Sequence, residues 1–322
     1  MRIVTVSVFF VIAAGAAAAG YPETEIGNGV VKAKLYLPDA ENGSYRGTRF
    51  DYSGIITSLE YKGHQYFGQW YEKHDPKIHD AITGPVEEFL TGDAALGYAE
   101  AKPGGTFVRI GIGSIRKPDE PAFRRFETYD IVDPGKRTLR QGKDWIEFTH
   151  ELKSPDGYAY LYTKRLSTPG NKPELVIEHS LKNTGQKVIE TDQYNHNFFV
   201  IDNEVVGPDM SIRFAFEPKP KAELKNGGEI RGRDIVYSRE LEKGESVFSE
   251  LEGFGSTASD YDIRIENHKS GAGVRIRGDQ PLSKVVFWSI RTTACPEAYV
   301  HIRLDPGKTA KWRIEYEFYT LR

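Results

Sequence analysis

The sequence predicts an all-β protein built as a large antiparallel β-sandwich, and three observations support this fold class. After residue 20, polar and apolar residues alternate with a period of two in segment after segment, as in strands with one buried face. Turn signals such as Asp133-Pro134-Gly135 and Asp305-Pro306-Gly307 separate these segments. The 322 residues include 17 Phe, 18 Tyr and 32 Gly, which is typical of turn-rich β proteins. The strands are too many for a small barrel, so we expect packed sheets.

The first twenty residues have the composition of a secretory signal peptide. Arg2 gives a basic start, residues 3–19 carry no charge, and Ala17-Ala18-Ala19-Gly20 offers small residues for cleavage. The alternative is an uncleaved membrane anchor, because the apolar run approaches the length of a spanning helix. We expect cleavage, a secreted or periplasmic protein, and no membrane association afterwards. The single Cys295 cannot form an internal disulfide, so the core alone must hold the mature chain.

The expected strands follow one another without a linker. Residues 30–37 alternate, and residues 55–61 lead through the Lys62-Gly63 turn to residues 65–67. Further alternating runs are residues 106–112, 126–132, 145–152, 159–166, 174–181 and 211–216, then 261–266, 273–277, 284–290, 299–304 and 311–319. The Pro-rich residues 217–221 are the best boundary candidate, but strands of the same character continue beyond them. We therefore predict one domain over residues 21–322.

The net charge of the chain bears on whether nucleic acid is a partner. The formal net charge is −3, whereas a broad nucleic-acid interface requires strong basicity. Nucleic acid is therefore not an expected partner.

The densest polar segment is residues 72–89. It contains His74 and His79 together with several carboxylates. Such a segment can be a solvated loop, the rim of a binding cleft, or a metal site. Zinc sites usually show tighter helical spacing or cysteines. We expect the loop and no metal.

A second polar segment, residues 45–54, contains Arg46 and Arg49 among aromatic residues at the entry to a strand. A planar guanidinium fork suits sugar hydroxyls or a uronate carboxylate. The alternative is an ion pair inside the sheet, for example between Arg49 and Asp51.

Two further segments carry the sequences Asn195-His196-Asn197-Phe198-Phe199 and Cys295-Pro296-Glu297-Ala298-Tyr299. Taken singly, His196 suits a hydrogen-bonded core residue and Glu297 an ordinary surface turn. Together with their surroundings they carry a resemblance. A strand at residues 175–182 and the turn Asn183-Thr184-Gly185 precede the first segment, and the Pro306-Gly307 turn and aromatic residues 312–318 follow the second.

This order of motifs resembles the aldose 1-epimerase (galactose mutarotase) family over about residues 25–320. The resemblance implies the galactose mutarotase-like supersandwich, with His196 and Glu297 as catalytic residues on a concave face. The family's first histidine lies in an Asn-x-x-His-Gly-Gly type segment. Here the corresponding region, residues 82–89, lacks that pattern, and His79, Glu87 and Glu88 are the candidates for the place.

The implied reaction is the interconversion of sugar anomers without a cofactor. Glu297 would remove the proton from the C1 hydroxyl, and His196 would protonate the ring oxygen. Arg46, Arg49 and Asn195 would orient hydroxyls or a carboxylate, and Trp288 would pack on the sugar face.

Two alternatives remain open at this stage. A polysaccharide lyase would use the arginines to neutralise a uronate and Tyr194 or His196 as the base. A non-catalytic carbohydrate-binding module would retain only the cleft.

Overall fold

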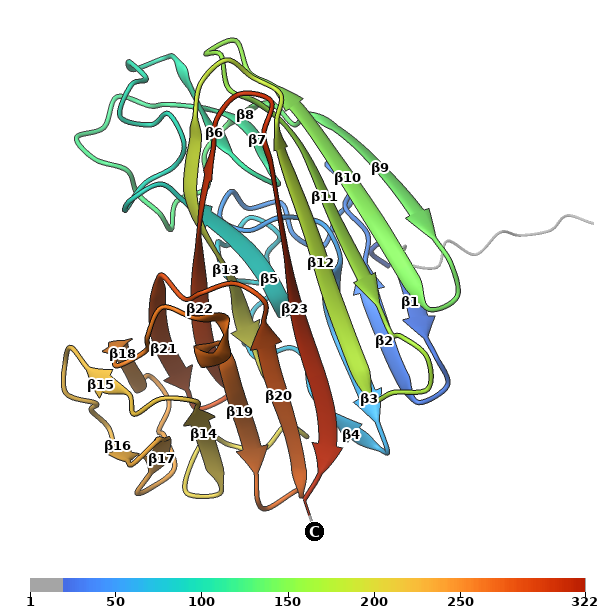
Figure 1. The fold of residues 1–322 in the computed structure, drawn as a ribbon, viewed down its shortest axis with the longest axis vertical. Helices are drawn as coiled ribbons and strands as arrows, with labels where there is room; N and C mark the ends of the chain where they lie inside the picture. Colours follow the sequence, from blue (N-terminus) through green and yellow to red (C-terminus); the bar gives the residue numbers. More distant parts are fainter. Residues whose placement is uncertain (1–19, 322) are drawn as a thin grey trace, which may run out of the picture.

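The computed structural model describes residues 20–321, and its regular structure over that range is almost entirely β (Figure 1). The one helical element there is the 3₁₀ turn η1 (Ala258–Asp260). The predicted all-β class is confirmed. Apart from Gly20, the predicted signal peptide lies outside the described residues. In the part that is described, no helix is long and apolar enough to cross a membrane.

The largest sheet contains ten antiparallel strands. In spatial order they are β16 (Gly228–Arg231), β17 (Asp234–Tyr237), β14 (Met210–Phe214), β19 (Asp262–Asn267), β20 (Ala272–Gly278), β23 (Thr309–Thr320), β12 (Glu174–Asn183), β11 (Ala159–Ser167), β10 (Trp145–Lys153) and β9 (Lys136–Gln141). Buried and exposed residues alternate along β10 and β23, as the sequence pattern predicts.

A second antiparallel sheet has six strands and lies behind the first in Figure 1. In spatial order they are β15 (Lys219–Pro220), β18 (Ser246–Glu252), β21 (Lys284–Ile290), β22 (Thr293–Leu304), β13 (Ile189–Phe198) and β5 (Gly84–Leu90). Its inner face packs against the ten-stranded sheet. Phe287, Val300 and Ile302 from this face share one apolar core with Ile177, Ile276 and Phe318 from the larger sheet.

Two smaller sheets complete the molecule. One contains β1 (Glu23–Gly27), β2 (Val31–Tyr36), β3 (Ile55–Tyr61) and β4 (His64–Gln65). The other contains β6 (Thr106–Arg109), β7 (Gly113–Arg116) and β8 (Ile131–Asp133) and lies at the top of Figure 1. A separate apolar cluster that includes Phe50, Phe107 and Phe198 joins this small sheet to the outer face of the six-stranded sheet.

Some strands are absent from the sequence prediction, among them residues 136–141, 189–198 and 246–252. Three further differences bear on the site. Residues 84–90, expected within a solvated loop, form β5 with every residue buried, because both faces of this strand are covered and the period-two pattern is lost. Residues 126–132 are mostly loop, with strand only from Ile131, and Phe126 is exposed. β22 begins at Thr293 rather than near 299, so Glu297 lies inside a strand and not in a surface turn.

Candidate active site

The register of β13 and β22 brings His196 and Glu297 together. These strands pair antiparallel from Ile189–Leu304 to Tyr194–Tyr299, and the same register returns at the Phe199–Ala294 bridge. Continued through the gap between these points, the register places His196 directly opposite Glu297. His196 Nε2 lies 3.1 Å from Glu297 Oε1, and both side chains are about 95% buried.

The pair lines a pocket of about 560 Å³ on the face of the six-stranded sheet that points away from the ten-stranded sheet. Side chains from four strands and three loops surround it: Arg49, His79, Asp80, Arg125, Phe126, His196, Phe198, Ser246, Phe248, Lys284, Val286, Trp288, Glu297 and Tyr299. The pocket therefore combines a proton-transfer pair with aromatic faces and cations, a lining that suits a polar ring.

Aromatic rings fix the plane of the His196 imidazole. Phe198 stacks on it at a centroid distance of 3.9 Å, and Trp70 stacks on the same Phe198 ring at 4.8 Å. Phe50 and Trp288 meet the imidazole edge-on, each at 5.7 Å. This apolar enclosure removes water from the imidazole.

Burial shifts the two pKa values in opposite directions. It lowers the pKa of His196 well below its usual value, and the nearby Arg49 guanidinium adds to this effect. Burial raises the pKa of Glu297 to about 7, although Arg49 and Arg125 oppose the shift. The 3.1 Å contact is within ion-pair distance, but the desolvation of both groups favours a neutral imidazole beside a carboxyl group that titrates near neutral pH.

Two stacked tyrosines connect this pair to a group of charges. The hydroxyl of Tyr299 donates to Glu297 Oε2 at 3.1 Å, and its ring stacks on Tyr194 at 4.2 Å. Tyr194 lies on β13 two residues before His196, so the two side chains share one face of the sheet.

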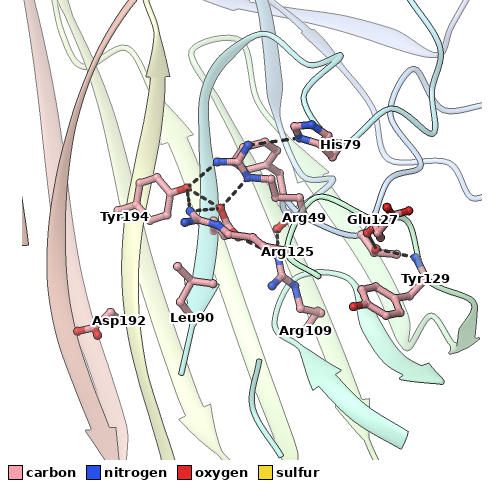
Figure 2. Close-up of polar contacts among 12 residues, drawn as sticks. Arg49, His79, Leu90, Arg109, Arg125, Glu127, Tyr129, Asp192 and Tyr194 are labelled. Carbon is pink, nitrogen blue, oxygen red and sulfur yellow. Dashed lines mark hydrogen bonds and ion pairs between the residues drawn. The ribbon is translucent and has the colours of Figure 1, made fainter. Parts of the chain in front are cut away.

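The charges form an ion cluster, which we define as Glu88 with Arg49, Arg109 and Arg125. The completely buried Glu88 carboxylate accepts hydrogen bonds from Arg49 at 2.9 Å, Arg109 at 3.0 Å and Arg125 at 2.7 Å. Figure 2 shows Arg49 and Arg125 also converging on the hydroxyl of Tyr194, at 3.2 and 2.6 Å. The three guanidinium groups hold the pKa of Glu88 well below its usual value despite its burial.

Four of the six residues predicted for the site line this pocket: His196, Glu297, Arg49 and Trp288. Asn195 does not, because it neighbours His196 on a strand and so points to the opposite face, where its amide donates to Glu87 at 3.1 Å. Arg46 lines a different pocket, with Tyr52 and Arg137.

The suggested Arg49–Asp51 ion pair is wrong. Arg49 reaches Glu88, and Asp51 is instead 3.6 Å from Arg137.

The sequence analysis assigned no role to Arg109 or Arg125, and Glu88 only a possible one. In the sequence, a buried carboxylate is indicated only by the adjacent acids Glu87 and Glu88, which stand between apolar residues. Arg125 lies in a loop with no motif around it, so only the tertiary structure reveals it.

The two histidines of the polar segment have different surroundings, and only His79 lines the pocket. His74 Nε2 is 2.9 Å from the carbonyl of Ser44, whereas His79 is at the pocket, 3.4 Å from Arg49 Nη1. Within residues 20–321 no cluster of three or more His, Cys, Asp or Glu side chains has an arrangement that could hold a metal ion.

No protein-family model matches the sequence, and no curated protein matches it either. Solved structures do. A GalM/aldose epimerase homologue from C. elegans matches with a TM-score of 0.57 and 13% identity, over 95% of this chain and 100% of that one. A galactose mutarotase-like protein from Clostridium acetobutylicum matches with a TM-score of 0.56 and 13% identity, over 93% and 95%. A galactose mutarotase related enzyme from Lactobacillus acidophilus gives 0.55 and 14%, over 92% and 97%. At these identities the likeness establishes the fold.

Proposed function

We propose that this chain, which has the galactose mutarotase-like fold, interconverts the anomers of a reducing sugar by acid/base catalysis. The observation that carries the proposal is the direct His196–Glu297 contact in the wall of an aromatic, polar pocket. The two oxygens that exchange protons in this reaction, the C1 hydroxyl and the ring oxygen, are attached to the same carbon. An acid and a base in contact with each other suit two such neighbouring oxygens.

The proton balance closes within the pair. In the form in which the single proton of the pair lies on His196, Glu297 takes the proton of the C1 hydroxyl while His196 gives its own to the ring oxygen, so the bond between C1 and the ring oxygen breaks and an aldehyde forms. Rotation about C1–C2 presents the other face of the aldehyde. Reclosure runs the same transfers in reverse, with the two residues exchanging roles, and it restores the original proton count. No cofactor takes part in this sequence.

Two further residues would position the sugar. The indole of Trp288 presents a face at the pocket, and the guanidinium of Arg49 offers planar donors to ring hydroxyls. Arg46 and Asn195 are not part of this proposal, since neither side chain lines the pocket.

The structural neighbours favour this reaction over the lyase and the binding module, because they include an aldose epimerase homologue and galactose mutarotase-related proteins. We also infer that the enzyme acts outside the cytoplasm, secreted or periplasmic. The support for this is the basic start, uncharged run and small residues of positions 1–20.

The test is anomer exchange measured by proton NMR with a panel of reducing sugars. We expect wild-type protein to accelerate exchange and Glu297→Gln to abolish it, because the amide fills the same volume but takes up no proton. His196→Gln should lose at least 100-fold, as roughly expected for one general acid. Circular dichroism on each variant serves as the control for folding. A Glu297→Gln variant with wild-type exchange rates would refute the proposal.

A further inference from the structure

The ion cluster contains more positive than negative charge. Three guanidinium groups surround the single carboxylate of Glu88, and the side chains are 1% exposed for Arg109, 8% for Arg49 and 29% for Arg125. Within residues 20–321, Glu88 is the only carboxylate within ion-pair distance of any of the three. A buried surplus of charge is costly unless something neutralises it.

The neighbouring groups do not remove this surplus. His79, 3.4 Å from Arg49, is kept towards its neutral form because burial lowers its pKa. Two other carboxyls line the pocket, and neither is within ion-pair distance of the three guanidinium groups: Glu297, whose pKa burial raises to about 7, and Asp80, which lies 3.8 Å from His79. Within the ion cluster itself, three guanidinium groups and one carboxylate leave an excess of two positive charges.

The surplus faces the pocket. Arg49 and Arg125 line the cavity, whereas Arg109 lies behind them at the end of β6 and donates to the carbonyl of Arg49 at 2.6 Å. Arg125 uses Nε and Nη2 for Glu88 and Tyr194. Its Nη1 makes no hydrogen bond to any described residue. Arg125, whose side chain is mostly buried and lines the pocket, therefore has one donor nitrogen without a partner in the described part of the chain.

We propose that the sugar taken by this pocket carries an anionic group, a carboxylate or a phosphate ester, which lies against Arg125 and Arg49. This inference rests on the proposed function, because it names the class of reducing sugar. A guanidinium fork matches the planar oxygens of a carboxylate and the oxygens of a phosphate alike. A neutral sugar would leave the positive surplus uncompensated.

The experiment compares three sugars with the same ring stereochemistry: D-glucose, D-glucuronate and D-glucose 6-phosphate. Anomer exchange is measured with wild-type protein, Arg125→Gln and Arg264→Gln. Arg264 lies on β19 of the ten-stranded sheet, outside the pocket, so its variant matches the change in net charge without touching the ion cluster. Glu88 keeps Arg49 and Arg109 as partners in Arg125→Gln, which favours folding of this variant.

We expect wild type to show a kcat/KM at least about 10-fold higher for one or both anionic sugars than for glucose, as for a hydrogen bond to a charged group. Arg125→Gln should reduce that ratio by about 10- to 100-fold, and Arg264→Gln should leave it unchanged. The two anionic arms identify the carboxylate or the phosphate as the recognised group. If Arg125→Gln does not fold, KM of the wild-type protein is measured at increasing salt concentration instead. Added salt should raise KM for the anionic sugar and not for glucose.

Equal kcat/KM values for the three sugars would overturn the inference and leave the proposed function standing. An unchanged ratio in Arg125→Gln would overturn it as well. If no sugar exchanges faster than in buffer, the proposed function fails, and thermal stabilisation decides the charge question. Stabilisation of wild type by the anionic sugars alone would support the inference, and stabilisation without preference would overturn it.

Discussion

His196 and Glu297 lie in an environment where neither ionised form is favourable on its own. Burial lowers the pKa of the imidazole and raises that of the carboxyl group to about 7. Groups in such close contact titrate as a unit, so their two apparent pKa values belong to the pair. Over the range between these values, the pair holds one proton, and this is the state that the proposed reaction needs. One partner then acts as the acid and the other as the base.

The pH dependence of kcat/KM should follow this proton. As the pH rises through about 7, the folded protein loses the last proton of the pair, so catalysed exchange should fall on the alkaline side. The acidic limb should lie well below pH 6.5, because the second proton must enter the desolvated imidazole. The measurement is NMR anomer exchange from pH 5 to 9, corrected for the spontaneous rate at each pH. A rate that rises steadily to pH 9 would contradict the shared proton.

Single residues differ in how far the sequence reveals them. His196 and Glu297 stand in short motifs, so their choice needed only local sequence. Asn195 was misplaced because side chains reverse direction at each residue of a strand, and its segment was not assigned to a strand at that stage. Arg125 gave no signal, since its contact with Glu88 joins residues 37 positions apart and depends on a loop conformation.

At the scale of the element, the central feature of the site is the short gap in the β13–β22 ladder. Asn197 spans it: its amide donates to the carbonyl of Pro296 at 2.7 Å and accepts from the hydroxyl of Tyr316, on β23, at 2.8 Å. This buried amide takes the place of ladder hydrogen bonds beside the His196–Glu297 pair. It therefore holds the two strands in register where their own pairing is interrupted.

Asn197→Ala should lower the free energy of unfolding by about 1–3 kcal/mol, because it removes the side-chain donor to the Pro296 carbonyl and the acceptor of the buried Tyr316 hydroxyl. Urea denaturation measures the loss. The control is Asn42→Ala at an exposed position, which should stay within about 0.5 kcal/mol of wild type. Equal stabilities of the two variants would show that the amide does not support the strands.

The predictability of each strand depends on how many of its faces are covered. β10, β11, β12 and β23 have one face in the core, so they show the alternation that the sequence analysis used. β5 is buried on both faces and contains Pro85, Glu87 and Glu88, so its sequence resembles a loop. For this reason local pattern does not predict the element that supports the ion cluster.

At the scale of the whole molecule, a buried ion pair connects the two large sheets. Lys164 on β11 donates to Glu87 on β5 and, at 2.8 Å, to the carbonyl of Ser53. Both charged side chains are almost completely buried. Burial raises the pKa of Glu87 to about 7 even though Lys164 opposes the shift. The sandwich is thus joined by a buried ion pair as well as by apolar packing and the Asn197–Tyr316 hydrogen bond.

Lys164→Met should destabilise the protein by about 3–5 kcal/mol at pH 8, because it leaves an ionised Glu87 buried without a cation. The loss should be smaller at pH 5. A carboxyl group whose pKa is raised in the folded state binds its proton there and loses the associated stability as the pH rises towards 7. The double variant Lys164→Met/Glu87→Gln should recover part of the stability at pH 8. Equal losses at both pH values in urea titrations would contradict this account.

The two acids in the middle of β5 are neighbours in sequence and partners of opposite networks: Glu87 points to the sandwich interior and Glu88 to the pocket. A shift of β5 by a single residue would turn both acids to the opposite face, taking Glu87 away from Lys164 and Glu88 away from the guanidinium groups. The proposed preference for an anionic sugar and the stability of the sandwich therefore both depend on the register of this one strand. A mutation that changes the register of β5 to alter the sugar preference is expected to lower stability as well, so a selected variant will need a compensating stabilising mutation.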